Sequence, residues 1–288
     1  MIEASQDSLE GRMRIHDFLY LVQNPVLWRT PMVVTIGVYD GIHLGHLEIL
    51  RTVVDTAQGH VAESWESMVI TFDRNPKMLK GTRPTSRPLA TRRQNEDFFT
   101  KIGIDHLVVI DFSDEFSRLS GEEFITLVCS ICAVKAMVVG EDFRCGAPVS
   151  AAGPVQLQEY LSRLAPEARL IIPPFVYNHD GEVDSSSLVR ENLQKGRLIA
   201  VSEMLGRDYE VDLAQYPSKI TESSLLFRTG QFIQLLPPPG AYETYLWLSD
   251  GTELSSRTFI DDQFLTIVPE VSELGPARPD RLCFIKEL

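Results

Sequence analysis

The sequence has few cysteines, and those present do not indicate a covalent scaffold. Four cysteines in 288 residues are too few for disulfide bonds to form the scaffold of a chain of this length. Cys129 and Cys132 form a C-x-x-C pair, but they lie within an apolar run, and no second pair or His-x-x-x-His motif completes a zinc site. We therefore expect both to be core residues on a helix.

Basic residues are also scarce relative to acidic ones. The chain has 27 Lys and Arg against 40 Asp and Glu, a formal net charge of −13 at pH 7. Because no run of Lys or Arg is longer than a pair, a protein that mainly binds nucleic acid phosphates is disfavoured. We expect small molecules or proteins as partners, and no nucleic acid.

The sequence lacks a long apolar run. The longest stretch, residues 124–139, is interrupted by polar residues and is shorter than the ~20 apolar residues of a membrane-spanning helix. Residues 1–17 carry four acidic side chains and no apolar central region, unlike a secretory signal. We expect a cytoplasmic protein with no membrane partner. The content of 44% hydrophobic and 23% charged residues is typical of a globular chain.

Strand and helix patterns alternate over the first two thirds of the chain. A β-branched run at residues 32–37 is followed by an apolar helical stripe from about Gly45. This alternation implies a parallel sheet covered on both faces, an α/β fold of the Rossmann-like type. Further strands are expected at residues 67–72, 105–111, 136–140 and 170–172, and helices at residues 92–102, 188–196 and 198–205.

The pattern changes after about residue 210. Short strands are expected at residues 227–236, 242–248 and 257–267, with turn sequences rich in Pro, Gly and Asp between them. No convincing helical pattern occurs in this part. We therefore expect two domains, an α/β domain over residues 1–210 and a small all-β, barrel-like domain over residues 211–288.

The densest chemical signal is the segment Gly37-Val-Tyr-Asp-Gly-Ile-His-Leu-Gly-His46 between the first strand and its helix. In a parallel sheet, ligands bind beyond the carboxyl ends of the strands. Glycines let the backbone approach a ligand, and Gly45 stands at a helix start, where free N–H groups favour phosphate. His43 and His46 can donate hydrogen bonds to phosphate oxygens. The alternative is an ordinary β–α loop, but an Asp three residues before H-x-G-H favours a nucleotide site.

This loop resembles the signature of the HxGH nucleotidyltransferase superfamily, which indicates the chemistry and leaves the substrate open. Four further motifs occur in the order and spacing of prokaryotic FAD synthetases. The sequence resembles the FMN adenylyltransferase module of that family over roughly residues 13 to 210. The four motifs are Phe72-Asp-Arg-Asn-Pro76, Gly140-Glu-Asp-Phe-Arg-Cys-Gly146, Ser185-Ser-Ser-Leu-Val-Arg190 and Leu205-Gly-Arg-Asp-Tyr209.

The resemblance implies transfer of AMP from ATP to FMN, which yields FAD and pyrophosphate, with Mg²⁺ bridging phosphates. The FMN phosphate oxygen would attack the α-phosphorus of ATP in line, with no protein nucleophile. The resemblance assigns a catalytic role to His43, His46 and Arg190. It assigns ATP binding to Gly37, Tyr39, Asp40, Gly45, Asp142, Ser185 and Ser186, and flavin binding to Phe72, Asn75, Pro76 and Arg144.

Several of these residues also have plainer interpretations. Serines 185–187 precede an apolar helical pattern and can simply cap that helix, although their hydroxyl and N–H groups also suit an anion. Asp142 and Arg144 can be a surface ion pair. Phe72 and Pro76 can be a core residue and a loop residue.

The sequence departs from the usual family pattern at several motif positions. Both histidines, Asp40 and Arg190 are retained. These departures leave two alternatives open. One is a flavin- or nucleotide-binding protein with little catalysis, and the other is an adenylyl- or cytidylyltransferase for another phosphorylated acceptor. The family usually has Asn at Val38, Phe at Tyr39, Pro at Arg74, His at Asn75, Phe at Cys145 and Arg at Leu188.

Bacterial members of the family usually continue into a riboflavin kinase domain marked by a glycine-rich stretch that runs into Pro-Thr-Ala-Asn. Here no Pro after residue 210 is followed by Thr, and Lys219-Ile-Thr-Glu-Ser-Ser occupies that place. We therefore expect a shrunken kinase-like domain without the kinase motif, and an FMN adenylyltransferase without riboflavin kinase activity.

Overall fold

The computed structural model describes residues 13–24, 30–73, 87–111, 113, 116–177, 179, 181–221, 224–271 and 276–288. The chain divides into two compact units. The first unit comprises residues 1–38, 49–76 and 96–174, and the second comprises residues 39–48, 77–95 and 175–288.

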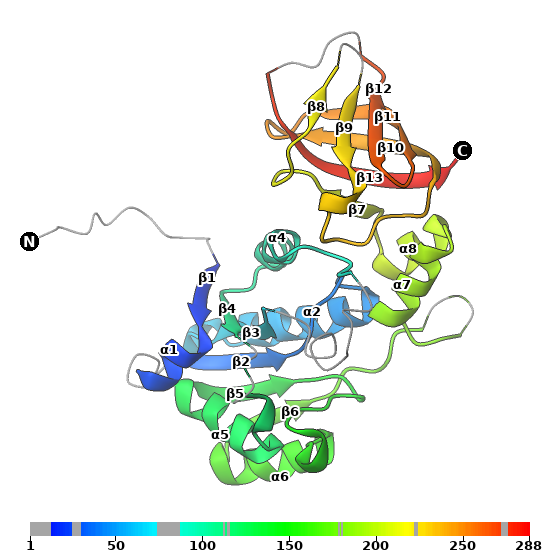
Figure 1. Cartoon of the computed structure of the whole chain (residues 1–288). Coiled ribbons are helices and arrows are strands. Elements are labelled where there is room, and N and C mark those ends of the chain that lie inside the picture. The colour runs from blue at the N-terminus through cyan, green and yellow to red at the C-terminus, as the bar shows by residue number, and fades with distance from the viewer. Residues whose placement is uncertain are drawn as a thin grey trace, which may run out of the picture. The chain divides into compact units, whose positions relative to one another are not determined.

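The first unit is built on a sheet of six parallel strands (Figure 1). This confirms the expected α/β, Rossmann-like class. In spatial order the strands are β1 (Arg14–Asp17), β4 (His106–Ile110), β3 (Glu66–Phe72), β2 (Pro31–Ile36), β5 (Ala133–Val138) and β6 (Arg169–Ile171).

Helices cover both faces of this sheet because its central strands are apolar on both sides. Met32, Val34 and Ile36 of β2 join one core with residues of α1, α5 and α6, and Val33, between them, points to the opposite face. Figure 1 shows α5 and α6 on one side of the sheet and α2 and α4 on the other. The helices are α1 (Phe18–Gln23), α2 (Leu44–Gln58), α4 (Arg92–Ile102), α5 (Gly121–Ile131) and α6 (Pro154–Leu164).

The C-x-x-C pair lies at the end of α5, as expected. Cys129 is on the helix, Cys132 is its C-cap residue, and both pack against the core. All four cysteines are free. Burial raises the pKa of the Cys129 thiol to about 11, so little of this side chain is present as the thiolate that binds metals or reacts.

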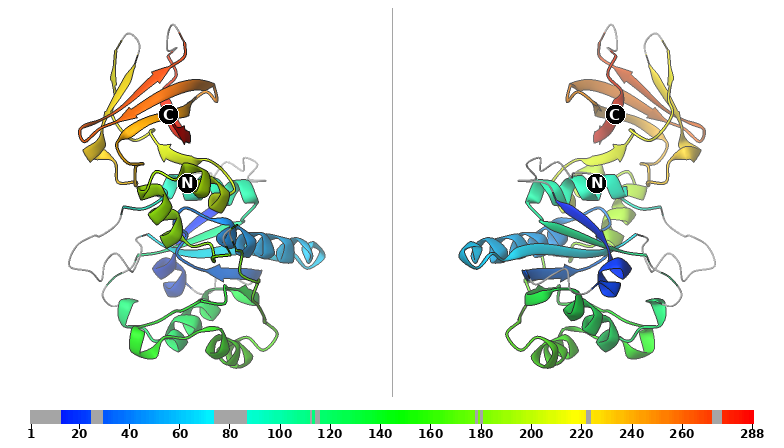
Figure 2. Two further views of the ribbon diagram at one scale, coloured as in Figure 1. Left: turned by 90° about the vertical axis from the view of Figure 1, so that its right-hand side faces the viewer. Right: turned by 90° about the vertical axis from the view of Figure 1, so that its left-hand side faces the viewer.

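The second unit contains an antiparallel sheet of seven strands, which Figure 2 shows curling round in yellow to red. Helices α7 (Ser186–Gln194) and α8 (Leu198–Leu205) pack together, and α8 contacts the two strands β7 and β13. In spatial order the strands are β7 (Tyr209–Asp212), β13 (Pro279–Glu287), β10 (Gly240–Leu248), β11 (Glu253–Ile260), β12 (Phe264–Pro269), β9 (Leu225–Arg228) and β8 (Lys219–Ile220).

Two expected strands of this sheet were wrong in their extent. The strand expected at residues 257–267 is a hairpin of β11 and β12, because the carboxylate of Asp261 accepts hydrogen bonds from the N–H groups of Gln263 and Phe264 at 2.7 Å and turns the chain. The strand expected at residues 227–236 ends at Arg228.

Short 3₁₀ turns occupy Thr229–Gln231, Val61–Glu63, Phe116–Arg118 and Pro148–Ser150.

Within the described part of the chain, no helix combines the length and apolar character needed to cross a membrane.

Candidate functional site

The loop between β2 and α2 turns sharply just before the first histidine. Gly41 has φ +85° and Ile42 has φ +38°, a left-handed conformation that is rare for a β-branched residue. A Cβ atom on Gly41 would lie 2.9 Å from Cβ of Leu89, so only glycine fits there. The turn places His43 directly before α2, where its carbonyl accepts the N–H of Leu47 at 2.9 Å.

His43 and His46 lie face to face at the start of α2. Their ring centroids are 3.8 Å apart with an interplanar angle of 28°, and the ring of Tyr39 lies 5.0 Å from that of His46. Nδ1 of each histidine is buried and has no hydrogen-bond partner among the described residues. Each of these nitrogens can therefore still form a hydrogen bond with a ligand or with water.

Both imidazoles are neutral at pH 7. Burial lowers the pKa of His43 to about 4, and the positive charge of Arg207 adds to this effect. Burial also lowers the pKa of His46 well below its usual value, with His43 contributing. Each neutral ring has one N–H donor and one acceptor nitrogen.

Asp40 connects this loop to α7. Its Oδ2 accepts a hydrogen bond from Nη2 of Arg190 at 2.5 Å, and its Oδ1 accepts from the N–H of Leu89 at 2.6 Å. The hydroxyl of Ser186 donates to the carbonyl of Asp40 at 2.7 Å. Burial raises the pKa of Asp40, and the Leu89 amide and the Arg190 guanidinium oppose this rise. The structure thus brings Asp40, Ser186 and Arg190 together beside the histidine loop.

The start of α7 lies next to Gly45. A Cβ atom on Gly45 would lie 3.7 Å from the carbonyl oxygen of Asp184 and 3.2 Å from Nδ1 of His43. Ser185 is the N-cap residue of α7, and its side chain accepts from the N–H of Leu188 at 3.2 Å. The helix-capping interpretation of Ser185 is therefore confirmed.

Asp184 was missed by the sequence reasoning. This residue is only 4% exposed, and neither carboxylate oxygen has a hydrogen-bond partner among the described residues. Burial raises its pKa to about 6. An unpaired buried carboxylate is destabilising, so its presence beside a helix start suggests a functional use. In the sequence, the only signal is an acidic residue immediately before the serine triplet.

Arg207 was also missed as a site residue, although its motif was noticed. Its guanidinium donates to the carbonyls of Gly41 at 2.7 Å, Ile42 at 2.9 Å and Leu205 at 3.0 Å. The signal in the sequence is an Arg directly after Gly206, which ends α8 with φ +66°. Arg207 is thus a second guanidinium beside the histidine loop.

Leu89 links the histidine loop to the antiparallel sheet. While its N–H is bound by Asp40, its carbonyl accepts from Nε2 of Gln234 at 2.8 Å and lies 3.1 Å from the hydroxyl of Tyr209. Tyr209 belongs to β7. Residues beyond position 208 therefore help to hold the backbone against which the loop packs.

Other expected site residues belong to the first unit. The N–H of Gly37 donates to the carbonyl of Ile70 at 3.1 Å and so extends the pairing of β2 with β3. Phe72 ends β3, with its ring edge-to-face against Phe116 at 6.1 Å. Asp142 is exposed beside Gly140. Asn75 and Pro76 lie outside the described residues.

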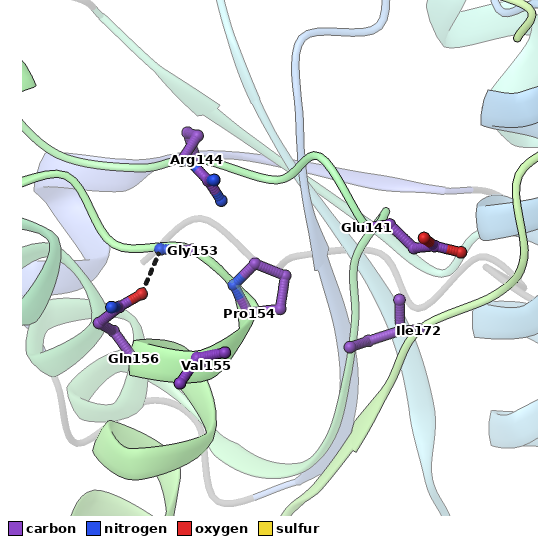
Figure 3. A pocket seen from close by; sticks show the side chains of 7 residues that line it. All are labelled: Glu141, Arg144, Gly153, Pro154, Val155, Gln156 and Ile172. Atoms are coloured by element: carbon purple, nitrogen blue, oxygen red, sulfur yellow. Dashed lines mark hydrogen bonds between the residues drawn. The ribbon is translucent and has the colours of Figure 1, made fainter.

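A pocket of about 520 Å³ lies in the first unit and includes Arg144. Nη1 of Arg144 would lie 2.1 Å from a Cβ atom on Gly153, and Figure 3 shows the guanidinium directed toward Gly153 and Pro154. Asp142 and Arg144, both described, form no ion pair with each other. The pocket is lined by Glu141, Arg144, Gly153, Pro154, Val155, Gln156 and Ile172.

A parallel α/β sheet whose central strand leads into a stacked H-x-G-H pair defines a nucleotidyltransferase. Sequence comparison narrows this class. The profile of the FAD synthetase family matches residues 28–187, more than half of the sequence, and the chain belongs to this family. It is therefore an FMN adenylyltransferase, an enzyme that uses ATP and FMN and forms FAD.

Individual relatives agree with this assignment. The chain is 30% identical over 195 residues to a putative bifunctional riboflavin kinase/FMN adenylyltransferase of Geobacillus thermodenitrificans, covering 67% of this chain and 97% of that protein. It is 25% identical over 213 residues to an FAD synthetase of Listeria monocytogenes, covering 74% of this chain and 80% of that protein.

A solved structure shares the fold. A crystal structure described as a macrolide-efflux protein from Streptococcus pneumoniae superimposes with a TM-score of 0.76 at 18% identity, covering 96% of this chain and 91% of that one. At this identity the likeness shows the fold alone.

Proposed function

We propose that this chain makes FAD from FMN and ATP at the histidine loop and does not phosphorylate riboflavin. The observation that supports the site most directly is the stacked pair His43 and His46, with Arg190 held beside it through Asp40. These side chains come from two segments far apart in the sequence and converge on one cluster.

Adenylyl transfer needs positioning and charge stabilisation more than covalent catalysis. The two imidazoles have buried nitrogens available for hydrogen bonds with phosphate oxygens. Nε of Arg190 is also buried without a hydrogen-bond partner among the described residues, and it can donate to the same anion. We assign His43, His46 and Arg190 to stabilisation of the triphosphate and of the charge that develops in the transition state.

The start of α7 and the turn before α2 complete the proposed ATP site. N–H groups at a helix start attract phosphate, and α7 begins beside Gly45. Tyr39, Asp40, Gly45, Ser185 and Ser186 hold or shape this region through the contacts described above. Gly37 and Asp142 keep their assignment to ATP on sequence grounds alone.

Mg²⁺ fits this site as an ion held mainly by the nucleotide. No group of three His, Cys, Asp or Glu side chains within the described ranges is arranged to hold a metal. Mg²⁺ usually binds through one or two carboxylates together with substrate phosphates and water. The oxygens of Asp184, which have no hydrogen-bond partner within the described ranges, provide one such carboxylate. Bound Mg²⁺ would neutralise phosphate charge during the transfer.

The Arg144 pocket is proposed for the flavin. Its volume is within the range of ligand pockets, roughly 300–1,000 Å³, and its lining is partly apolar with one guanidinium. A planar guanidinium can stack on an aromatic ring or bind a phosphate. Phe72, Asn75 and Pro76 remain assigned to the flavin by their motif.

Residues 211–288 are proposed to be a kinase-like domain without the kinase motif, with adenylyl transfer assigned to residues 1–210. This proposal is supported by the absence of any Pro-Thr pair after residue 210, where the family's kinase motif would stand. The link from Tyr209 through Leu89 to Asp40 gives the β sheet a supporting role beside the adenylyl site.

Two parallel assays test the proposed function. Purified protein with Mg²⁺ and ATP receives either FMN or riboflavin, and the products are separated by chromatography. We expect FAD from FMN and no FMN from riboflavin. FMN formed from riboflavin would refute the absence of kinase activity. Quenching of FMN fluorescence without FAD would indicate a binding protein, and pyrophosphate release only with another phosphorylated acceptor would indicate a different transferase.

A further inference from the structure

The backbone of the turn that precedes His43 accepts hydrogen bonds from one side chain. Arg207 donates from Nη2 to the carbonyl of Gly41 and from Nη1 to the carbonyl of Ile42. Nη1 also donates to the carbonyl of Leu205 at the end of α8. A single guanidinium thus ties two consecutive peptides of the turn to a helix that follows it by more than 150 residues.

This turn needs such a partner. A β-branched residue at φ +38° is strained, and it persists only where its surroundings determine it. Ile42 is only 1% exposed, so packing holds its side chain. Arg207 holds the backbone of the same residue through its carbonyl.

The two bound carbonyls belong to the two residues immediately before His43. Any rotation of these peptides would move the His43 ring, which has little room. It lies 3.8 Å from the His46 ring, and a Cβ atom on Gly45 would already lie 3.2 Å from it. The orientation of the Gly41 and Ile42 peptides therefore sets the position of the His43 imidazole.

We propose that Arg207 is a positioning residue for adenylyl transfer, which fixes the Gly41–Ile42 turn and thereby keeps His43 stacked on His46. This inference rests on the proposed function, because it concerns the same site. Arg207 acts through His43. The same guanidinium lowers the pKa of His43, so removing its charge raises that pKa.

Two substitutions separate the effect of the guanidinium's hydrogen-bond geometry from the effect of its positive charge. Arg presents donors on two nitrogens in a fixed plane, whereas Lys has one rotatable ammonium. Arg207→Lys keeps the positive charge but cannot donate to both carbonyls of the turn. Arg207→Gln loses the charge and the paired hydrogen bonds. Arg197→Gln is the matched control, because Arg197 is exposed at the opposite end of α8 and its side chain makes no capping hydrogen bond.

The first measurement is steady-state FAD synthesis by the full chain. We expect both Arg207 variants to lose about 100-fold in kcat with little change in KM for ATP or FMN, because a small misplacement of a catalytic group costs that much. Only in Arg207→Gln should the acid limb of the pH profile move to higher pH. The control should retain the activity of the unaltered protein. An unchanged kcat in Arg207→Gln would overturn the proposal.

The second measurement does not depend on turnover. NMR titration of the histidine rings reports the environment and the pKa of His43 in each variant, alongside a thermal unfolding scan that establishes folding. We expect shifted His43 resonances in both Arg207 variants and a raised pKa in Arg207→Gln. Unaltered His43 signals would refute the positioning role even if the protein makes no FAD. Absence of FAD synthesis by the unaltered protein, with His43 signals altered in both variants, would instead reject the proposed function. If Arg207→Gln does not fold, the kcat and the His43 resonances of Arg207→Lys provide the test.

Discussion

Asp40 and Arg190 form a buried ion pair, with 2.5 Å between Oδ2 and Nη2 and side chains only 8% and 15% exposed. Removing one member of such a pair leaves the other charge buried without its partner. The contact also joins the histidine loop to α7, so its loss affects both the fold and the proposed ATP site.

Replacing Asp40 should therefore destabilise the protein strongly. We expect Asp40→Ala to lower the free energy of unfolding by about 3–5 kcal/mol, measured by urea unfolding. The matched control is Glu191→Ala, which removes the exposed pair of Glu191 with Lys195 and should change stability little. Similar losses in the two variants would contradict the importance of burial.

His46 is expected to take part directly in catalysis. If its imidazole donates to a phosphate in the transition state, His46→Ala should lower kcat for FAD synthesis by about 10²–10³-fold, the usual cost of removing such a donor. Circular dichroism should show an intact fold. His60, whose ring stacks on Trp65 at 3.8 Å, provides the control, and His60→Ala should keep its turnover. Near-normal turnover in His46→Ala would remove the catalytic assignment.

Gly45 allows activity and stability to be separated. A methyl group at this position would press on the His43 ring at 3.2 Å, while Ala stabilises a helix relative to Gly by up to about 1 kcal/mol. We expect Gly45→Ala to have unchanged or higher stability and clearly lower FAD synthesis. Gly230→Ala, where a Cβ atom would meet nothing within 4 Å, should leave FAD synthesis unchanged. A fully active Gly45→Ala would argue against a tightly packed His43.

His43 should make stability depend on pH. Its pKa is about 4 in the folded protein against the usual 6.5, so the unfolded chain takes up a proton first as the pH falls. Its stabilising contribution is complete above about pH 6.5 and is lost as the pH falls toward 4, an effect of about 3 kcal/mol. Urea unfolding between pH 7 and 4.5 should show a smaller decline in His43→Gln. Equal declines would contradict the lowered pKa.

Asp184 should have the opposite effect on the pH dependence of stability. Its pKa is raised to about 6, so ionisation destabilises the folded protein as the pH rises from 3.8 through 6, and the cost is complete at pH 7. We expect Asp184→Asn to be more stable than the parent at pH 7, with no difference below pH 4. If Asp184 holds Mg²⁺, the variant should also bind Mn²⁺ more weakly in the presence of ATP, measured by electron paramagnetic resonance. Unchanged Mn²⁺ binding would leave Asp184 without a metal role.

Local patterns predicted the regular elements well where apolar spacing was clear. Helix α4 occupies the expected Arg92–Ile102, and Gly103 follows it with φ +92°. The expected strand at residues 32–37 is β2, Pro31–Ile36. In contrast, β1 was not expected, because its four residues, Arg-Ile-His-Asp, have no apolar alternation. It forms through pairing with β4, 92 residues away in the sequence.

For the site, the contiguous motif was enough to place His43 and His46 together at a helix start, since neighbours in sequence share a local conformation. The adenylyltransferase family was likewise evident from motifs in order. The spacing of residues could not predict the hydrogen bond of Asp40 with Arg190, the hydrogen bonds of Arg207 to Gly41 and Ile42, or the burial of the Asp184 carboxylate. These features depend on the folding of distant segments against each other, which sets burial and the direction of each donor, and no local pattern encodes either.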